Sequence, residues 1–376
     1  MSLEIREVRT KKEISTFVRF PLSLYKNHPY YVPALVFDDM ATFNSKKNPA
    51  YDFCESIRFL AYKDGKIVGR VAGLINHNAN EGWKVKDVRF GWFDAIDDLE
   101  VTKALMDAVA GWGMKKGMTH LTGPLGFTDL DPEGMLIEGY DLIGTLATIY
   151  NYPYYPVHME KLGFEKEVDW KEFHINIPES IPDRYIRMSN IVAEKFELRI
   201  VKEKSLSKLV KLYGEKLFQL INETYCVLYG FSTLTERQMK YYIKMYLSFA
   251  RTDLISIIVD KNDKVVGLGI TMPSLSKAMQ KSKGSLFPFG FIHMLKALRK
   301  NTVVDFYLMG VHPEYQNKGV SAMIFADLYP NFVKNGYTLG ETNPELETNN
   351  KIQLLWSDFN PEPVRRRRVF KKELVQ

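Results

Sequence analysis

The feature that most constrains the fold is a weak internal repeat. Residues 59–76 and residues 255–273 each read as an apolar run, a polar turn and a second apolar run. This pattern is typical of a β-hairpin. The segment KIVG at Lys66–Gly69 recurs as KVVG at Lys264–Gly267. The chain is therefore expected to contain two copies of one structural unit.

Each half continues in the same order, with helices before the hairpin and then a strand, a helix, a strand, a helix and a last strand. This order predicts the α/β class, as a mixed, mainly antiparallel sheet with helices on both faces. Pro178 and Pro182 interrupt the pattern between the halves. We expect a first domain at 1–178, a linker at 179–195 and a second domain at 196–376.

Length and composition agree with two globular domains. A chain of 376 residues with 45% hydrophobic residues exceeds what one core usually organises. Cys54 and Cys226 stand far apart without metal spacing, so neither a disulfide framework nor a metal site is expected. No secretory leader or membrane-spanning run is visible, which predicts a cytoplasmic protein. The net charge of +6 gives only weak support for a polyanionic partner.

A glycine-containing turn opens a helix in the second half, within GVHPEYQNKGVSAMIFADLY at residues 310–329. The N-terminus of a helix presents backbone N–H groups without partners, and its dipole favours an anion. Gly319 lets a phosphate approach these groups closely, and Lys318 adds a positive charge. The segment predicts a pyrophosphate site, against the alternative of an ordinary strand–turn–helix connection.

The same segment resembles a known signature. Its pattern V-x-P-x-x-Q-x-x-G-x-small is similar to the acyl-CoA-binding motif of the GNAT (Gcn5-related N-acetyltransferase) superfamily, with Ser321 where Gly or Ala is usual. The resemblance extends over nearly the whole second half and implies two tandem GNAT-like domains. It implies that backbone groups of Met309, Gly310 and Val311 bind the pantetheine. The phosphates would be held by the run Gln316, Asn317, Lys318, Gly319, Val320, Ser321 and Ala322.

The first half resembles a degenerate copy of this domain. Asp97 and Asp98 stand where the glycine-rich turn is expected, and two carboxylates cap a helix well but repel a phosphate. The first copy is therefore expected to bind no CoA. Its stretches GPLGFTDLDPEGMLIEGYD and NYPYYP also resemble a group of bacterial tandem acetyltransferase-like proteins, and that likeness implies no particular substrate.

Acyl transfer to an amine needs a base, a hydrogen-bond donor for the thioester carbonyl and a proton for the leaving thiolate. The resemblance implies the backbone N–H of Val311 as the donor. Asp305 stands on the same strand where some family members carry a catalytic Glu, and Glu341 on the next strand is the other candidate base. Asp305 could equally be a strand-start residue in a turn. His312 is expected to be exposed rather than catalytic.

The expected acid is missing. The last helix of the family often reads N-x-x-x-x-x-L-Y, with the Tyr near the CoA sulfur, and here Asn349 and Leu355 are kept but Trp356 replaces the Tyr. The resemblance places Asn349 and Trp356 at the cofactor. An indole N–H donates a hydrogen bond but is no acid near neutral pH. Water, Tyr337 or Tyr307 could supply the proton, or no transfer takes place.

Two further stretches allow a functional and a structural interpretation. The run Arg365–Arg368 could bind nucleic acid. It could instead form the last strand, with alternate arginines in solvent and Val369 and Phe370 in the core. We favour the strand, because four successive residues of a strand cannot all face one way. The aromatic run 150–155 is expected to pack in a loop. Residues 286–298 could cover a fatty chain, but we favour a packed amphipathic helix.

The sequence thus predicts a CoA-dependent acyltransferase, foremost an N-acetyltransferase in which a small amine or amino-acid-like acceptor attacks acetyl-CoA directly. Neither cysteine lies in a nucleophile motif, which disfavours a covalent route. The alternatives are a non-catalytic acyl-CoA-binding module, an acyltransferase for longer chains and, third, a nucleic-acid-binding protein. The acceptor stays open, as does the choice between monomer and homodimer.

Overall fold

The computed structural model describes residues 2–246 and 250–375, and the chain divides into two compact units. Unit 1 comprises Met1–Lys171, Leu275–Leu295 and Val364–Gln376. Unit 2 comprises Glu172–Ser274 and Lys296–Pro363. Each unit therefore takes its last strand segment from the other half of the chain.

The strands of unit 1 follow the order of the chain: the first four pair antiparallel in turn, and the fourth and fifth are parallel. The last strand of the chain then pairs antiparallel with the fifth, with Phe370 opposite Gly123. A short strand also pairs with that last strand. In order, the strands are β1 (Leu3–Glu7), β2 (Cys54–Lys63), β3 (Lys66–Asn76), β4 (Asp87–Ala95), β5 (His120–Gly123), β6 (Met135–Glu138) and β14 (Glu362–Glu373).

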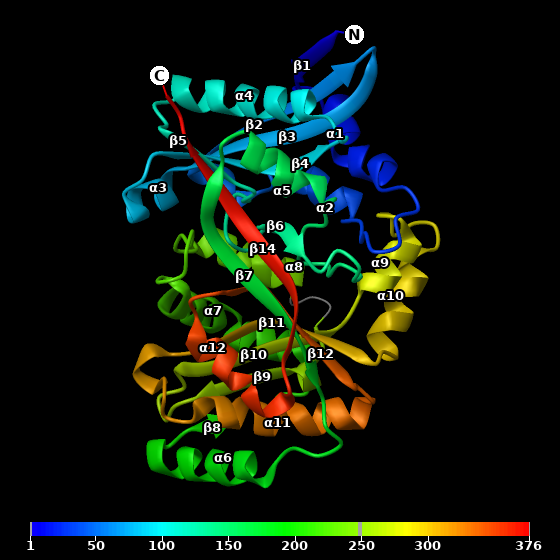
Figure 1. Ribbon diagram of the computed structural model, residues 1–376. Helices are drawn as coiled ribbons and strands as arrows, with labels where there is room; N and C mark the ends of the chain where they lie inside the picture. The colour runs from blue at the N-terminus through cyan, green and yellow to red at the C-terminus, as the bar shows by residue number, and fades with distance from the viewer. Residues whose placement is uncertain (1, 247–249, 376) are drawn as a thin grey trace. The chain divides into compact units, whose positions relative to one another are not determined.

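Helices cover both faces of this sheet because β3 is apolar on both sides. Val71 and Ile75 pack in a core with α4, while Ala72 and Leu74 pack on the opposite face with Phe17 of α1. Figure 1 shows α4 lying across β2, β3 and β4, and the three strands contact it. The helices are α1 (Lys11–Leu24), α2 (Val36–Thr42), α3 (His77–Trp83), α4 (Leu99–Lys115), α5 (Tyr154–Lys161), α9 (Ser276–Ser282) and the first part of α10 (Gly290–Arg299).

The sheet of unit 2 has the same order of strands, again with one parallel pair, β11 and β12. Its outermost partner is the Glu172–Asn176 part of β7, which runs antiparallel to β12. The strands are β7 (Glu165–Asn176), β8 (Arg199–Ile200), β9 (Ile255–Val259), β10 (Val265–Pro273), β11 (Val303–Val311), β12 (Leu339–Thr342) and β13 (Glu345–Leu346). The helices are α6 (Asp183–Phe196), α7 (Leu206–Tyr225), α8 (Glu236–Tyr246), α11 (Val320–Asn335) and α12 (Asn350–Leu355).

The predicted repeat and fold class are confirmed. The order β1-β2-β3-β4-β5 returns as β8-β9-β10-β11-β12, and a helix, α4 or α11, connects each parallel pair. Residues 183–196, in and just beyond the predicted linker, form α6, and its Val192 is buried in the core of unit 2. The division at 1–178 and 196–376 stays a prediction about the repeat, since compactness groups the residues differently from chain order.

The run of four arginines lies in β14, as predicted, but its expected exposure was wrong. Arg365 and Arg367 are 3% and 1% exposed and donate to the carbonyls of Ile143 and Ile149. Arg366 and Arg368 reach the fully buried carboxylate of Asp169, at 2.7 and 2.8 Å. Loop carbonyls and one buried carboxylate in unit 1 provide the partners that pull the guanidinium groups inward. The run therefore forms no basic surface patch.

Among the residues that the structure describes, no helix is long and apolar enough to cross a bilayer. The same residues contain no cluster of His, Cys, Asp and Glu arranged to hold a metal ion. The tyrosines of the run 150–155 pack in unit 1, with Tyr155 1% exposed and stacked rings at Tyr152 and Tyr154, but Tyr154 and Tyr155 lie in α5 and not in the predicted loop.

Candidate functional site

The parallel strands β11 and β12 diverge near the middle of β11. Their pairing covers Val303–Phe306 opposite Leu339–Thr342, where β12 ends. Residues 308–311 remain paired with β10 on one side only, Tyr307 is the extra residue where that register shifts, and all five are partly exposed. This leaves an open strand edge in unit 2, a place where an extended ligand can add hydrogen bonds.

The register shows which groups face that edge. His312 N–H donates to Val266 O, which makes this pair a hydrogen-bonded position of the antiparallel ladder. Such positions alternate with positions whose N–H and C=O point away from the partner strand. Val311 and Met309 occupy the alternate positions and so direct their backbone groups to the open edge.

Two side chains already hold these carbonyls. The Tyr225 hydroxyl of α7 donates to Met309 O at 3.1 Å, and Gln316 Nε2 donates to Val311 O at 3.2 Å. Gln316 Oε1 also accepts from Lys351 Nζ at 3.3 Å. Gln316 thereby fastens the loop to the end of β11 and leaves the Val311 N–H directed at the open edge.

The turn after β11 shapes the start of α11. Asn317 and Gly319 have positive φ angles of 60° and 84°, and Gly319 occupies the N-cap without any side-chain cap. Exposed Lys318 stands beside it, with Nζ 5.3 Å from the Phe196 ring and 5.4 Å from the Tyr315 ring. The first N–H groups of α11 therefore face outward beside a positive charge, a geometry that suits a phosphate.

The equivalent helix in unit 1 is closed to an anion. Asp98 caps α4 and accepts from the N–H groups of Glu100 and Val101 at 3.0 and 3.4 Å. It also pairs with Lys63 at 2.6 Å, and the hydrogen bond from Lys63 lowers the pKa of Asp98. The carboxylate of Asp98 thus occupies the position in unit 1 that corresponds to the predicted phosphate site of unit 2.

The strand edge in unit 1 is closed as well. The hydroxyls of Tyr154 and Tyr155 donate to Ala95 O at 2.7 and 3.2 Å, and Ala95 N–H donates back to the Tyr155 hydroxyl at 2.9 Å. Phe93, Asp94 and Ala95 at the end of β4 are buried, unlike residues 307–311 of β11. In unit 1, tyrosine side chains thus occupy the strand edge that is open in unit 2.

The two candidate bases lie side by side. Asp305 and Glu341 are register partners on β11 and β12, so their side chains share one face of the sheet, and both are buried. Glu341 is in turn opposite His174 on β7, whose Nε2 lies 3.4 Å from Glu341 Oε1. The neighbours Val304 and Phe306 point to the opposite face, into the core. His174 is a residue that the sequence analysis missed.

His312 was expected to be exposed, and this was wrong. Its side chain is 7% exposed, with Nε2 3.1 Å from Glu223 Oε2 and 2.8 Å from Lys264 Nζ. Its Nδ1 accepts from Glu314 N–H at 3.3 Å. Pro313 turns the chain directly after His312, which folds the ring back over α7 and β10 instead of into solvent.

Trp356 and Asn349 have clear structural roles. The Trp356 ring is buried against Phe306 and Phe325, with centroids 5.0 and 5.8 Å apart. Asn349 caps α12 by accepting from Ile352 N–H at 3.4 Å. That either residue also touches a cofactor stays a prediction.

The indole N–H of Trp356 points to a residue absent from the sequence-based site. It donates to Glu345 Oε1 at 2.7 Å, while Glu345 Oε2 is buried without a hydrogen-bond partner among the described residues. Burial raises the pKa of Glu345 to about 8, and the Trp356 hydrogen bond only partly opposes this. Glu345 is therefore mostly a neutral acid near pH 7, with a proton to donate.

Glu345 stands close to the point where β11 and β12 part. Two residues before it, Asn343 donates from its backbone to Phe306 O at 3.2 Å and from Nδ2 to Tyr307 O at 2.9 Å. These bonds fix the segment that leaves β12 against β11. Sequence reasoning missed Glu345 because no motif marks it, although its place between Glu341 and the last helix was visible.

No family model matches the chain, whereas comparison with known proteins found relatives and solved structures. The chain is 26% identical to protein YghO of Escherichia coli over 98% of its length and 95% of that protein. It is 23% identical to a bacterial ceramide synthase of Caulobacter vibrioides, covering 86% of this chain and 84% of that one.

Solved structures match it over its full length. One is a tandem GNAT protein from the clavulanic acid biosynthesis pathway, with a TM-score of 0.57 at 11% identity and 100% and 99% of the two chains covered. Another is a GCN5-related N-acetyltransferase from Sphaerobacter thermophilus, with a TM-score of 0.53 at 9% identity and 100% and 96% covered.

Proposed function

We propose that this chain, which has the tandem GNAT fold, transfers an acyl group from acyl-CoA to an amine. The observation that carries the proposal is the contrast between the two copies of the unit. In unit 2 the strand edge at residues 307–311 is open and the N-cap of α11 is bare. In unit 1 tyrosines and Asp98 occupy both positions. One copy keeps room for the cofactor that the fold accommodates, and the other does not.

The acyl-CoA fits unit 2 in two parts. Its pyrophosphate would accept from the N–H groups of Val320 and Ser321, with Lys318 alongside. Its pantetheine would lie along residues 307–311 and accept from the outward N–H of Met309, which leaves the Val311 N–H for the thioester carbonyl. This arrangement directs the thioester toward the point where β11 and β12 diverge.

Direct attack by the amine then needs three groups of this chain. Asp305 or Glu341, supported by His174, accepts a proton from the attacking nitrogen, and the Val311 N–H stabilises the oxyanion as the C–N bond forms. The C–S bond breaks, and the thiolate takes the proton of Glu345. Trp356 holds Glu345 for this step, so the Trp that replaces the expected Tyr still serves the acid.

The length of the acyl chain is the finer question. The expectation from the sequence is acetyl transfer to a small amine. The relative named ceramide synthase favours a longer acyl donor, because a ceramide is an N-acylated long-chain amino alcohol. We therefore propose N-acyl transfer, with long-chain acyl-CoA as the first donor to test and acetyl-CoA as the second.

Calorimetric titration of the full chain with CoA, acetyl-CoA and palmitoyl-CoA tests the proposal. We expect one site per chain and tighter binding of the preferred donor. Release of CoA thiol in the presence of a long-chain amino alcohol or a small amine then reports transfer. Binding without any turnover would favour the non-catalytic module, and two equal sites per chain would contradict the closed state of unit 1.

A further inference from the structure

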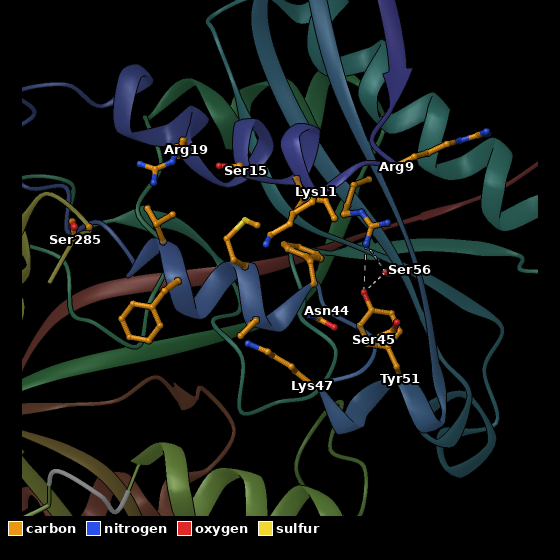
Figure 2. Close-up of a pocket in the computed structure, with 18 of the residues that line it drawn as sticks. Arg9, Lys11, Ser15, Arg19, Asn44, Ser45, Lys47, Tyr51, Ser56 and Ser285 are labelled. Atoms are coloured by element: carbon orange, nitrogen blue, oxygen red, sulfur yellow. Dashed lines mark hydrogen bonds between the residues drawn. The ribbon is translucent and has the colours of Figure 1, made fainter. Parts of the chain in front are cut away.

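Unit 1 contains a large hollow that the proposed reaction does not use. It has a volume of about 870 Å³. Its walls come from α1, α2, the loop after α2, β2 and residues 284–287, all within unit 1 (Figure 2). A hollow of this size, lined by none of the residues proposed to bind acyl-CoA, needs its own explanation.

Positive charge dominates one wall of the hollow. Five cationic side chains line it and no carboxylate does: Arg9, Lys11, Arg19, Lys47 and Arg58. Arg9 pairs with Glu7 at 2.6 Å, whereas the other four make no ion pair within the described part of the chain. Figure 2 shows Lys11 extending from α1 and Lys47 from the loop after α2. Like charges gathered without a counter-ion repel, so an anion bound among them relieves that repulsion.

Arg58 is the one of these five cations that is only partly exposed, and its guanidinium lies 5.7 Å from the Phe43 ring centroid. Its Nη1 lies 3.5 Å from both the Tyr51 hydroxyl and Ser56 Oγ, which are weak contacts. Its Nε is buried and has no hydrogen-bond partner among the described residues. A phosphate oxygen in the hollow suits Nη1, because its two present contacts are weak and guanidinium groups bind phosphate strongly.

The other wall is apolar and continues onto the surface. Val36, Phe37 and Met40 of α2 face Leu286 and Phe287. Phe37 is 53% exposed and Phe287 is 77% exposed.

Beyond the hollow, the apolar surface extends along the chain. Phe289 is 68% exposed, and Phe291, Ile292 and Leu295 of α10 are exposed as well. Exposed aromatic side chains clustered at one place mark an interaction surface. The stretch 286–298 is thus not fully packed, contrary to the interpretation that we favoured from the sequence.

We propose that this surface of unit 1 docks on a bilayer of anionic phospholipids. A lipid phosphate occupies the hollow among Lys11, Lys47 and Arg58, and Phe37 and Phe287 insert at the boundary between headgroups and acyl chains. Cations beside exposed aromatic groups are the pattern of proteins that lie on a membrane surface. A soluble phosphate compound would use the cations but would leave the exposed phenylalanines in water, so the bilayer explains both walls.

The test is flotation of the full chain with vesicles of phosphatidylcholine alone or with added phosphatidylglycerol. We expect at least tenfold more protein on the anionic vesicles, and less as salt is raised, because salt screens the attraction. Phe37→Ala with Phe287→Ala should weaken the binding that remains at high salt. Equal flotation with both vesicle types, or none with either, would overturn the proposal.

Neighbouring lysines provide a matched control. The pair K11E/K47E reverses two charges in the hollow, whereas K12E/K46E reverses two exposed charges in the same segments outside its lining. Both pairs change the net charge equally and both place a Glu in the first turn of α1. We expect only K11E/K47E to lose most vesicle binding while it keeps acyl-CoA binding in the calorimetric titration.

Two results would contradict the docking site. Equal losses in both double variants would show that general charge, and not the hollow, attracts the vesicles. Displacement of the protein from vesicles by millimolar-range glycerol phosphate, at matched ionic strength, would show that a soluble phosphate compound is the occupant.

Discussion

In the mechanism that we propose, Glu345 and Trp356 together replace an acid that is missing from the expected motif. A tryptophan cannot donate a proton near neutral pH, but its indole N–H holds one carboxyl oxygen of Glu345 and leaves the other free to carry a proton. On this proposal a positioning residue fills the usual position of the acid, and the acid itself comes from β13. This exchange of roles makes Glu345 the residue whose substitution is most informative.

Glu345→Gln should lower kcat by about 10²-fold or more, the usual contribution of general acid catalysis, with little change in KM for acyl-CoA. The pKa of about 8 sets the pH dependence: wild-type turnover should fall as pH rises through 8, because the acid loses its proton. The variant should lack that fall. Steady-state rates across this pH range check both expectations. A variant with wild-type kcat would remove Glu345 from the reaction.

The same residue predicts how stability depends on pH. The pKa of Glu345 is raised from 4.5 to about 8, so folding favours its protonated form. Its contribution is fully present below pH 4.5 and is lost as pH rises through 8. Wild type should therefore lose up to about 5 kcal/mol relative to Glu345→Gln over this interval, at about 1.4 kcal/mol per pKa unit. Thermal melts of both proteins at several pH values measure the difference, and parallel curves would contradict a buried neutral Glu345.

The turn before α11 offers a clean test of phosphate binding at Ser321. Gly319 is a poor choice, since a Cβ there would lie 2.9 Å from Val192 and the residue has φ of 84°. Ser321→Glu instead places a carboxylate in the first turn of α11, which the helix dipole tolerates or favours. We expect CoA affinity to fall at least tenfold in calorimetric titration while Tm stays the same or rises.

Asp98→Ala is the matched control in unit 1. It removes the N-cap of α4 and should cost about 1 kcal/mol of stability, as caps usually do. CoA affinity should not change, because Asp98 occupies the position of the phosphate in the copy that we propose binds none. A loss of affinity in this variant would mean that unit 1 contributes to the cofactor site.

At the scale of elements, β14 shows how a charge pattern can mislead. The arginine run was correctly predicted to be a strand with alternating sides, but not to be buried: Arg365 and Arg367 are buried, and Arg366 and Arg368 are only partly exposed. Arg365 and Arg367 point inward because the loop carbonyls of Ile143 and Ile149 accept from them. A guanidinium with five donors satisfies carbonyls that no ladder reaches.

Arg367→Ala should therefore destabilise the protein by about 2–3 kcal/mol, since it leaves a buried carbonyl unpaired and a cavity behind. Arg366→Ala should cost less, because Arg368 still pairs with Asp169. Urea unfolding of both variants gives the comparison. Equal stability of wild type and Arg367→Ala would show that the arginine is dispensable for folding.

Also at this scale, the two copies differ in how a parallel strand pair ends. The geometry of β4 with β5 and of β11 with β12 is equivalent, yet tyrosines on α5 close the first pair. Neither strand sequence predicts this difference. It arises because the helix that follows each copy presents different side chains, tyrosine hydroxyls in one case and a buried tryptophan in the other.

At the scale of the whole molecule, we propose that the two units have different functions. Unit 2 keeps the features that suit acyl-CoA, while unit 1 has lost them and carries the cationic hollow instead. We expect one acyl-CoA per chain and independent responses: K11E/K47E should change vesicle binding alone, and Ser321→Glu should change CoA binding alone. Either variant affecting both properties would contradict this division of tasks.

The sequence by itself determined the repeat, the two hairpins, the bare helix start at Gly319 and the place of Asp305 and Glu341. Those features depend on short spacings, on turn residues and on the alternation of a strand, which neighbouring residues decide. The tertiary structure alone decided which strands end each sheet, the burial of His312 and the arginines, and the pairing of Glu345 with Trp356. Each of these joins residues distant in the chain, and the free energy of burial and of hydrogen bonding belongs to the partners together, so no local pattern contains it.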